Sequence, residues 1–323
     1  MKTNTSQRII EIIKQKKQVK PKELPESLAI SERAVFKQLR KLLEKGVLEK
    51  TGIPPRVYYY LKQEKGKEKV FLKIKSQIIE NFFLIITPAG QRLSGLTGFK
   101  YWCDKHRLSV KKTAKEYESA YKKYAKYKKS GLIDGMYKLR STFNDVYINR
   151  LYYLEFYSIE RFGKTKLGWL LLYAKQSQSK LLIKELVEEI RGGIQKIIRR
   201  YHIDAIGFIP PTVKRDIQLM AELEKNLNFS LPLIKFQKIK MPIVVPQKTL
   251  NRLEDRIENA EKSIFLNDNR IFKNILLIDD AVGSGATINE VAKKIREKKL
   301  VKNKIIGLAI TGSFKGFEVI SEV

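Results

Sequence analysis

The sequence has little of the residues that build metal centres and disulfides. Cys103 is the only cysteine among 323 residues, and two histidines occur. A single cysteine excludes an internal disulfide and any zinc site built on several cysteines. Long apolar runs are also lacking. The longest, at 82–86 and 169–173, fall far below the roughly 20 residues needed to span a bilayer.

The N-terminal segment MKTNTSQRII shows no basic-then-apolar secretory pattern. We therefore expect a cytoplasmic protein that makes no membrane contact. With 43% apolar residues, the chain has enough material for two or three packed cores.

Acidic residues are scarce relative to basic ones. Lys and Arg outnumber Asp and Glu by 65 to 34, which gives a formal net charge of +31. Such a field favours polyanions, either nucleic acid or phosphorylated substrates. A genome rich in lysine codons would produce the same excess without any binding purpose, so the position of the charges matters more than their sum.

Residues 1–62 are predicted to form three helices and a hairpin. Isoleucines at 9, 10, 12 and 13 indicate an amphipathic helix, a second helix fits 22–28, and Ser31 is a good N-cap for a third. Gly46 ends the third helix, and VLEK, the turn TGIPPR and VYYYL follow as a hairpin with a basic tip. The apolar face of the third helix carries Val35, Leu39, Leu42 and Leu43.

This order of elements resembles the winged helix-turn-helix family. The resemblance implies that the third helix enters a major groove of DNA and that the hairpin touches phosphates. The alternative is a solvated basic face on a module that contacts another protein. The DNA-binding residues implied are Arg33, Lys37, Arg40, Lys41 and Arg56.

Residues 63–150 are predicted to be a linker followed by a mostly helical middle region of unknown role. The linker is charged and contains glycine, and a helix is expected over 111–129. That helix carries a stripe of tyrosines among lysines, which favours packing over the stacking of nucleic-acid bases. The tyrosines are Tyr117, Tyr121, Tyr124 and Tyr127.

Residues 151–323 are predicted to form an α/β domain with a parallel sheet. The strand pattern LYYLEFY, a turn at Phe162 and Gly163 and an apolar run before Lys175 lead into a helix over 180–200. The strand AIGFI, a helix after Pro211, the strand PIVV, the strand NILLI, a helix after Thr287 and the strand IIGLAI follow. Strands that alternate with helices and are apolar throughout are typical of parallel sheets covered on both faces.

The string NILLIDDAVGSGATINEVAKKI combines a buried strand, two acids, a loop of small residues and an amphipathic helix. In open α/β sheets such a loop lies where ligands bind. Its backbone N–H groups and hydroxyls can surround a phosphate at the helix N-terminus. A Walker A interpretation fails because no lysine follows the glycines, and a Rossmann interpretation fails because the acids precede the loop.

The same string resembles the motif by which type I phosphoribosyltransferases bind 5-phosphoribosyl-1-pyrophosphate (PRPP). The resemblance implies that Asp279 and Asp280 bind the ribose hydroxyls. It also implies a cradle for the 5-phosphate, made by Val282, Gly283, Ser284, Gly285, Ala286 and Thr287.

Two further segments fit that family. PPTVKRD lies where the family binds pyrophosphate, which implicates Pro211, Thr212, Lys214 and Arg215. The stretch 247–265, together with LLLYAKQSQSKLLIKELVEEI, resembles the ComF-like subgroup, although the cysteine-rich zinc module typical of that subgroup is replaced by the winged helix. A mobile loop that closes over the site is expected to contain Gln247, Lys248, Arg252, Arg256 and Asn259.

The resemblance implies transfer of a phosphoribosyl group to a nitrogen acceptor with release of pyrophosphate. Mg²⁺ would be held by oxygens of PRPP, so no protein metal cluster is expected. One alternative is a PRPP-sensing transcriptional regulator without catalysis, since purine-operon repressors join the same two kinds of domain. Another is a competence accessory protein that binds single-stranded DNA. The oligomeric state stays open, a homodimer being one option.

Overall fold

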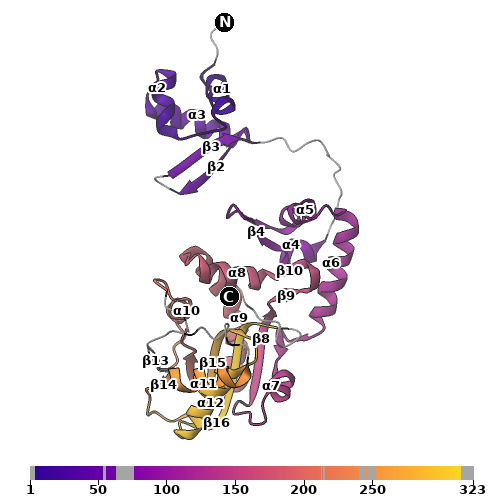
Figure 1. Cartoon of the computed structure of the whole chain (residues 1–323), viewed down its shortest axis with the longest axis vertical. Coiled ribbons are helices and arrows are strands. Elements are labelled where there is room, and N and C mark those ends of the chain that lie inside the picture. The colour runs from indigo at the N-terminus through magenta and orange to yellow at the C-terminus, as the bar shows by residue number, and fades with distance from the viewer. Residues whose placement is uncertain are drawn as a thin grey trace. The chain divides into compact units, whose positions relative to one another are not determined.

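The structure is a computed structural model, and it describes residues 4–53, 56–62, 76–211, 213, 215–239, 245, 250 and 252–313. The chain divides into two compact units, Met1–Leu72 and Lys73–Val323 (Figure 1). Among the described residues, no helix is long and apolar enough to cross a membrane.

The first unit contains the three predicted helices and the predicted hairpin. Its sheet has the order β1-β3-β2 with antiparallel pairs. The apolar sides of the helices and of the hairpin meet in one core, which includes Ile9, Ile13, Val35, Leu39 and Leu48. The elements are α1 (Thr5–Lys16), β1 (Gln18–Val19), η1 (Pro21–Glu23), α2 (Leu24–Leu28), α3 (Glu32–Glu44), β2 (Leu48–Ile53) and β3 (Arg56–Leu61).

The start of α3 is fixed by the predicted cap. The Ser31 hydroxyl accepts a hydrogen bond from the Ala34 N–H at 3.3 Å, which satisfies a donor that the first helical turn leaves without an intrahelical partner. The helix ends at Glu44, and Gly46 then adopts φ +66°, a left-handed conformation that suits glycine. The chain can thus turn sharply into β2.

The second unit is built on a seven-stranded mixed sheet with the order β12-β11-β15-β16-β8-β7-β6. The five strands from β12 to β8 run parallel, and β7 and β6 extend the sheet antiparallel. The strands of this sheet are β6 (Lys128–Lys129), β7 (Leu132–Asp134), β8 (Arg150–Phe156), β11 (Ala205–Phe208), β12 (Leu233–Ile234), β15 (Phe272–Val282) and β16 (Val301–Gly312). The α/β class with a mostly parallel central sheet is therefore confirmed.

Helices and short hairpins complete the second unit. The helices are α4 (Gln77–Phe82), α5 (Gly95–Lys105), α6 (Val110–Ala125), α7 (Met136–Thr142), α8 (Lys166–Gln176), α9 (Lys180–Tyr201), α10 (Leu219–Leu227), α11 (Leu253–Ser263), α12 (Ala286–Glu297) and the 3₁₀ turn η2 (Glu160–Phe162). The hairpins pair β4 (Leu84–Ile86) with β5 (Arg92–Ser94), β9 (Ser158–Ile159) with β10 (Gly163–Lys164), and β13 (Phe236–Lys238) with β14 (Ile264–Leu266).

Two apolar clusters cover the two faces of the large sheet. The first cluster joins side chains of α5, α6, α7 and α12 to alternate residues of the strands, such as Leu277 of β15. The second joins α8, α9 and α10 to the intervening residues, such as Ile278. Because successive side chains of a strand point to opposite faces, each central strand is apolar throughout.

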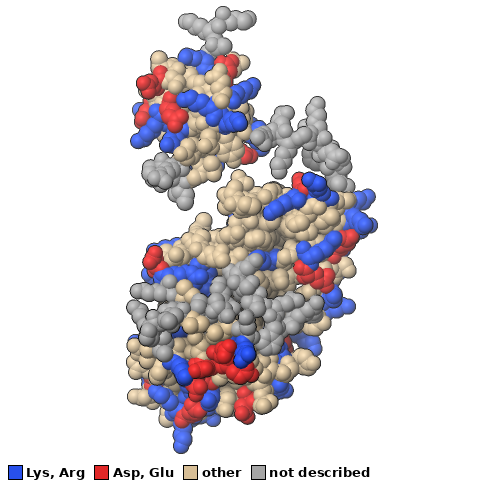
Figure 2. Space-filling view, viewed as in Figure 1, with Lys and Arg blue, Asp and Glu red and all other residues tan. Residues whose placement is uncertain are grey.

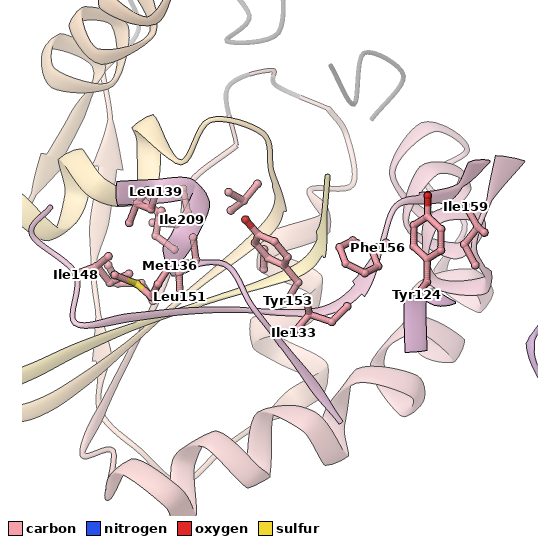
Figure 3. Close-up of a cluster of buried hydrophobic side chains, with 14 of the residues drawn as sticks. Tyr124, Ile133, Met136, Leu139, Ile148, Leu151, Tyr153, Phe156, Ile159 and Ile209 are labelled. Atoms are coloured by element: carbon pink, nitrogen blue, oxygen red, sulfur yellow. The ribbon is translucent and has the colours of Figure 1, made fainter. Parts of the chain in front are cut away.

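The predicted division at residue 150 differs from what the structure shows. Residues from Lys73 onward belong to one unit, since β7 pairs with β8 and α5 to α7 pack against the sheet. Figure 3 shows Met136 and Leu139 of α7 beside Ile148 and Leu151, in the same cluster. The middle region therefore forms part of the core on one face of the sheet.

Details of three predicted elements also differ. The tyrosine helix ends at Ala125, and Tyr117 and Tyr124 are buried in the first cluster, which confirms packing for these two. The apolar run before Lys175 is helix α8, buried on most sides. The predicted strand PIVV falls, except for Val245, outside the described residues.

Candidate functional site

Strand β15 ends in the two adjacent carboxylates at the edge of the sheet. It lies between β11 and β16, with Ile278 opposite Phe208 and Asp279 opposite Ala309. All neighbouring strands here are parallel, so their carboxyl ends meet at this edge, the usual ligand site of open α/β sheets.

The two carboxylates belong to opposite faces of the sheet. Leu277 lies in the first cluster and Ile278 in the second, so the alternation of the strand directs Asp279 to the first face and Asp280 to the second. The Asp279 carboxylate accepts a hydrogen bond from the Asp280 N–H at 2.8 Å. Asp280 forms an ion pair with Lys175 of α8, and these side chains are only 14% and 15% exposed.

The environment disfavours a second negative charge on this pair. Burial first, and the charge of Asp280 second, raise the pKa of the Asp279 carboxyl, while Lys175 acts in the opposite direction. Burial makes the ionised form of this carboxyl unfavourable, and hydroxyl groups of a ligand that donate hydrogen bonds to it would stabilise that form. Such perturbed carboxyls are common at binding sites.

The turn between β15 and α12 is built from small residues. Gly285 has φ +88°, a conformation that favours glycine, and a Cβ there would lie 2.4 Å from Leu139 Cδ1, so a larger residue would also require the Leu139 side chain to shift. Ser284 is buried, and its hydroxyl accepts from the Ala286 N–H at 3.3 Å. The predicted cradle residues thus run without a break from Val282 at the end of β15, through the turn 283–285, to Ala286 and Thr287 at the start of α12. The N-terminus of a helix favours anions.

Two cations from distant parts of the sequence lie beside this turn. Lys138 of α7 donates to the Gly283 carbonyl oxygen. Arg256 of α11 places Nη1 3.8 Å from the position that a Gly283 Cβ would take. Burial first, and the charge of Arg256 second, lower the pKa of Lys138 to about 8.

Helix α12 is anchored by hydrogen bonds to the segment between α7 and β8. The Asn289 carboxamide accepts from the Tyr147 N–H at 2.9 Å and donates to the Asp145 carbonyl at 2.9 Å. The segment before β8 therefore fixes the first turn of α12 and, with it, the adjacent loop.

The predicted pyrophosphate loop follows β11 at the same edge. The Ile209 N–H donates to the Ile278 carbonyl at 2.9 Å, so the chain leaves β11 beside the carboxylates. Gln218 donates to the carbonyl of Arg215, and the Ile217 N–H donates to Gln178, just after α8. Pro211 and Arg215 are both half-buried. Thr212 and Lys214 lie outside the described residues.

The predicted mobile loop is helical in its second half. Arg256 and Asn259 belong to α11, where Arg256 donates to the Leu250 carbonyl at 2.8 Å and Asn259 to the Val245 carbonyl at 3.3 Å. Arg252 is exposed at the start of this helix. Gln247 and Lys248 lie outside the described residues. Arg256 is thus a buried neighbour of the glycine turn, whereas the expectation was a mobile contact to the leaving group.

The predicted DNA-binding side chains of α3 form an exposed basic face. Arg33, Lys37, Arg40 and Lys41 are all exposed, opposite the buried Val35 and Leu39. Figure 2 shows several patches of Lys and Arg side chains on the visible face of the first unit, with Asp and Glu among them. Arg56 begins β3, but its side chain is not among those described.

One residue of this edge carries no signal in the sequence. Lys138 stands in a segment, GMYKLRS, with no functional pattern. Lys175 lies in the stretch LLLYAKQSQSKLLIKELVEEI that resembles the ComF-like subgroup, but the resemblance assigns it no partner, and the structure pairs it with Asp280. Within the described residues, no group of three or more His, Cys, Asp or Glu side chains could hold a metal ion.

Replacing Lys175 by methionine is expected to destabilise the protein in a pH-dependent way. Loss of the cation leaves two neighbouring carboxylates buried, which costs about 3 kcal/mol of unfolding free energy at neutral pH. Lys175 keeps the pKa of Asp279 from rising further. The carboxyl of the variant therefore has a still higher folded pKa, and its destabilisation grows as pH rises above about 4.

Thermal unfolding at pH 4.5 and pH 7.5 measures this effect. Lys166→Met is the matched control, because Lys166 lies on the same helix and pairs with the more exposed Glu189. We expect a small, pH-independent change in the control. An equal loss for both variants at both pH values would contradict the role assigned to Lys175.

Comparison with known proteins gives little further guidance. No family model matches the chain, and no curated protein matches it in sequence. Among solved structures, a hypoxanthine phosphoribosyltransferase from Staphylococcus aureus is similar with a TM-score of 0.23 and 12% identity, over 40% of this chain and 74% of that one. A TM-score this low does not establish a shared fold.

Proposed function

We propose that the second unit binds PRPP at the carboxyl edge of its sheet and transfers the phosphoribosyl group to a nitrogen acceptor, releasing pyrophosphate. The observation that carries this proposal is the arrangement of Asp279, Asp280 and the turn 282–287 between the central parallel strand and the N-terminus of α12. The resemblance of the sequence to the phosphoribosyltransferase motif supports the same ligand.

Each part of the arrangement suits one part of PRPP. The carboxylates accept hydrogen bonds from the ribose 2- and 3-hydroxyls, and the backbone N–H groups of the turn donate to the 5-phosphate. The loop after β11, with Arg215, faces the diphosphate. Ribose hydroxyls would replace Lys175 as partners of Asp280, leaving this cation to meet the negative charge of the leaving group.

Transfer from C1 proceeds through an oxocarbenium-like transition state, which needs positioning and charge stabilisation more than acid–base catalysis. Mg²⁺ bound to oxygens of PRPP would neutralise the diphosphate. The chain's own contribution is to hold the ribose by its hydroxyls and its phosphate while the C1–oxygen bond breaks and the C1–nitrogen bond forms.

The test is pyrophosphate release. The full chain is incubated with PRPP, Mg²⁺ and a panel of nitrogen acceptors: nucleobases, ammonia and aromatic amines. We expect release that depends on one acceptor class. If PRPP binds but no acceptor produces pyrophosphate, the transferase proposal is wrong and PRPP sensing takes its place.

The first unit favours a second candidate function, DNA binding coupled to PRPP. The observation behind it is the exposed basic face of α3, set opposite a packed apolar face. The alternative is a solvated basic face on a module that contacts another protein. In this reading PRPP would shift the DNA affinity and DNA would shift the PRPP affinity by the same factor.

Arg33→Ala combined with Arg40→Ala is expected to weaken duplex binding about tenfold and to lower the salt slope by about two, because two phosphate contacts are lost. Electrophoretic or fluorescence titrations at several salt concentrations measure both. The control removes two charges from α1, with Arg8→Ala and Lys14→Ala, which are also exposed.

If the two double variants weaken DNA binding equally, the loss comes from the lower net charge, and α3 does not form a recognition face. A preference for single strands over duplex would favour the competence accessory role over the regulator.

A further inference from the structure

Two basic side chains, remote from each other in the sequence, meet at the glycine turn. Lys138 comes from α7 and Arg256 from α11, and both approach Gly283. Neither belongs to the turn itself, and α7 precedes the first parallel strand of the sheet.

Both cations are withdrawn from water. Arg256 is 9% exposed, and Lys138 is half-buried on the inner side of its short helix. The charge of Arg256 acts to lower the pKa of Lys138, as does burial. Two like charges brought together at low dielectric raise the free energy of the protein, and an anion placed between them relieves both.

The turn that they flank has the shape for a compact anion. Gly285 is left-handed against Leu139, Ser284 is buried, and the N–H groups at the start of α12 have no intrahelical acceptors. A tetrahedral phosphate takes several such donors at once, and its double negative charge matches two cations.

Asp279 and Asp280 lie between the site flanked by Lys138 and Arg256 and the loop after β11, which is proposed to bind the diphosphate. Lys175 and Gln178, which hold Asp280 and the loop after β11, belong to the α8–α9 side with the second cluster. Leu139, the neighbour of Lys138 on α7, belongs to the first cluster. The two ends of a bound PRPP would therefore meet different sets of cations.

We infer that Lys138 and Arg256 bind the phosphate monoester of the ligand, which is the 5-phosphate of PRPP, and that Lys138 leaves the Gly283 carbonyl to do so. This inference rests on the proposed function and adds two segments, α7 and α11, to the phosphate cradle.

Calorimetric titrations of the full chain with ribose 5-phosphate, inorganic phosphate and pyrophosphate test it. Lys138→Met is expected to lose about 10- to 100-fold in affinity for ribose 5-phosphate, the effect of one charge-assisted hydrogen bond, and little for pyrophosphate. Arg140→Met, an exposed cation on the same helix, is the matched control and should change neither. Tighter binding of ribose 5-phosphate than of inorganic phosphate identifies a sugar phosphate as the ligand.

Proton uptake on binding distinguishes direct contact between Lys138 and the phosphate from a purely structural role of Lys138. Burial first, and the charge of Arg256 second, lower the pKa of Lys138 to about 8. A dianion beside Lys138 restores its charge, so binding at pH 8.5 should take up a proton, seen as a heat that depends on the ionisation enthalpy of the buffer. Lys138→Met should show no such uptake, and Lys138→Arg should keep the affinity but lose the uptake.

The outcomes separate the two proposals. Wild-type binding that Lys138→Met leaves unchanged, or weakens equally for ribose 5-phosphate and pyrophosphate, overturns this inference alone. A wild-type chain that binds none of these ligands, nor PRPP, overturns the proposed function together with it.

Discussion

Replacing Asp279 and Asp280 together by asparagine will remove measurable PRPP binding while the second unit stays folded. Each carboxylate is proposed to accept hydrogen bonds from ribose hydroxyls, and loss of two charge-assisted bonds weakens binding by at least about 100-fold. Titration of PRPP with Mg²⁺ into the variant measures the loss. Asp104→Asn with Glu224→Gln, two exposed acids elsewhere, is the control for the change in net charge.

Stability should move in the opposite direction to affinity. The pKa of Asp279 is raised in the folded protein, chiefly by burial, so the free energy of unfolding falls as pH rises above the unfolded pKa of about 4. An asparagine does not ionise. Asp279→Asn alone should therefore unfold at a higher temperature than wild type at pH 7, and this gain should vanish near pH 4. A variant that loses both affinity and stability at pH 7 would point to a structural role for the acids.

A fragment of residues 151–323 will fail to fold cooperatively, whereas residues 73–323 will unfold in a single transition. The shorter fragment lacks α5, α6, α7 and β7, which cover one face of the sheet and contribute many of the buried side chains of the first cluster. Exposing that face removes a large part of the apolar burial, and net stability is only a small difference between large terms.

Circular dichroism during thermal unfolding, with dye binding to exposed apolar surface, compares the two fragments. A cooperative transition of 151–323 at a temperature close to that of 73–323 would mean that the middle region is an accessory layer. The longer fragment serves as the control, since it coincides with a compact unit of the chain.

The centre of the sheet could be predicted because its signals are local. The runs at 205–208, 275–278 and 305–310 are apolar at every position, which is the pattern of parallel strands buried on both faces. The acids and glycines that follow the second of these runs lie on the same short segment, so their proximity needs no knowledge of the tertiary fold. The same holds for the Ser31 cap and the apolar face of α3.

The rest of the site depends on contacts between distant residues. Lys138 and Gly283 are 145 positions apart in the sequence, and Lys175 and Asp280 are 105 positions apart. A lysine in a lysine-rich chain carries no mark of such a contact. Both lysines are partly buried, and their burial follows from how α7 and α8 pack against the sheet.

The boundary at residue 150 was misplaced for a related reason. Strand β7 spans three residues and β6 two, too short for a periodic pattern to be recognised. They extend one edge of an otherwise parallel sheet with antiparallel strands, a common feature of mixed sheets. Tyr117 and Tyr124 indicated locally that their helix is packed, but they did not indicate which elements it packs against.

Titration calorimetry of PRPP with Mg²⁺ into the full wild-type chain tests the central proposal most directly. We predict saturable binding near one ligand per chain that requires Mg²⁺ and competes with ribose 5-phosphate and with pyrophosphate. The absence of any saturable heat, with the protein shown to be folded, would contradict PRPP as the ligand of this site.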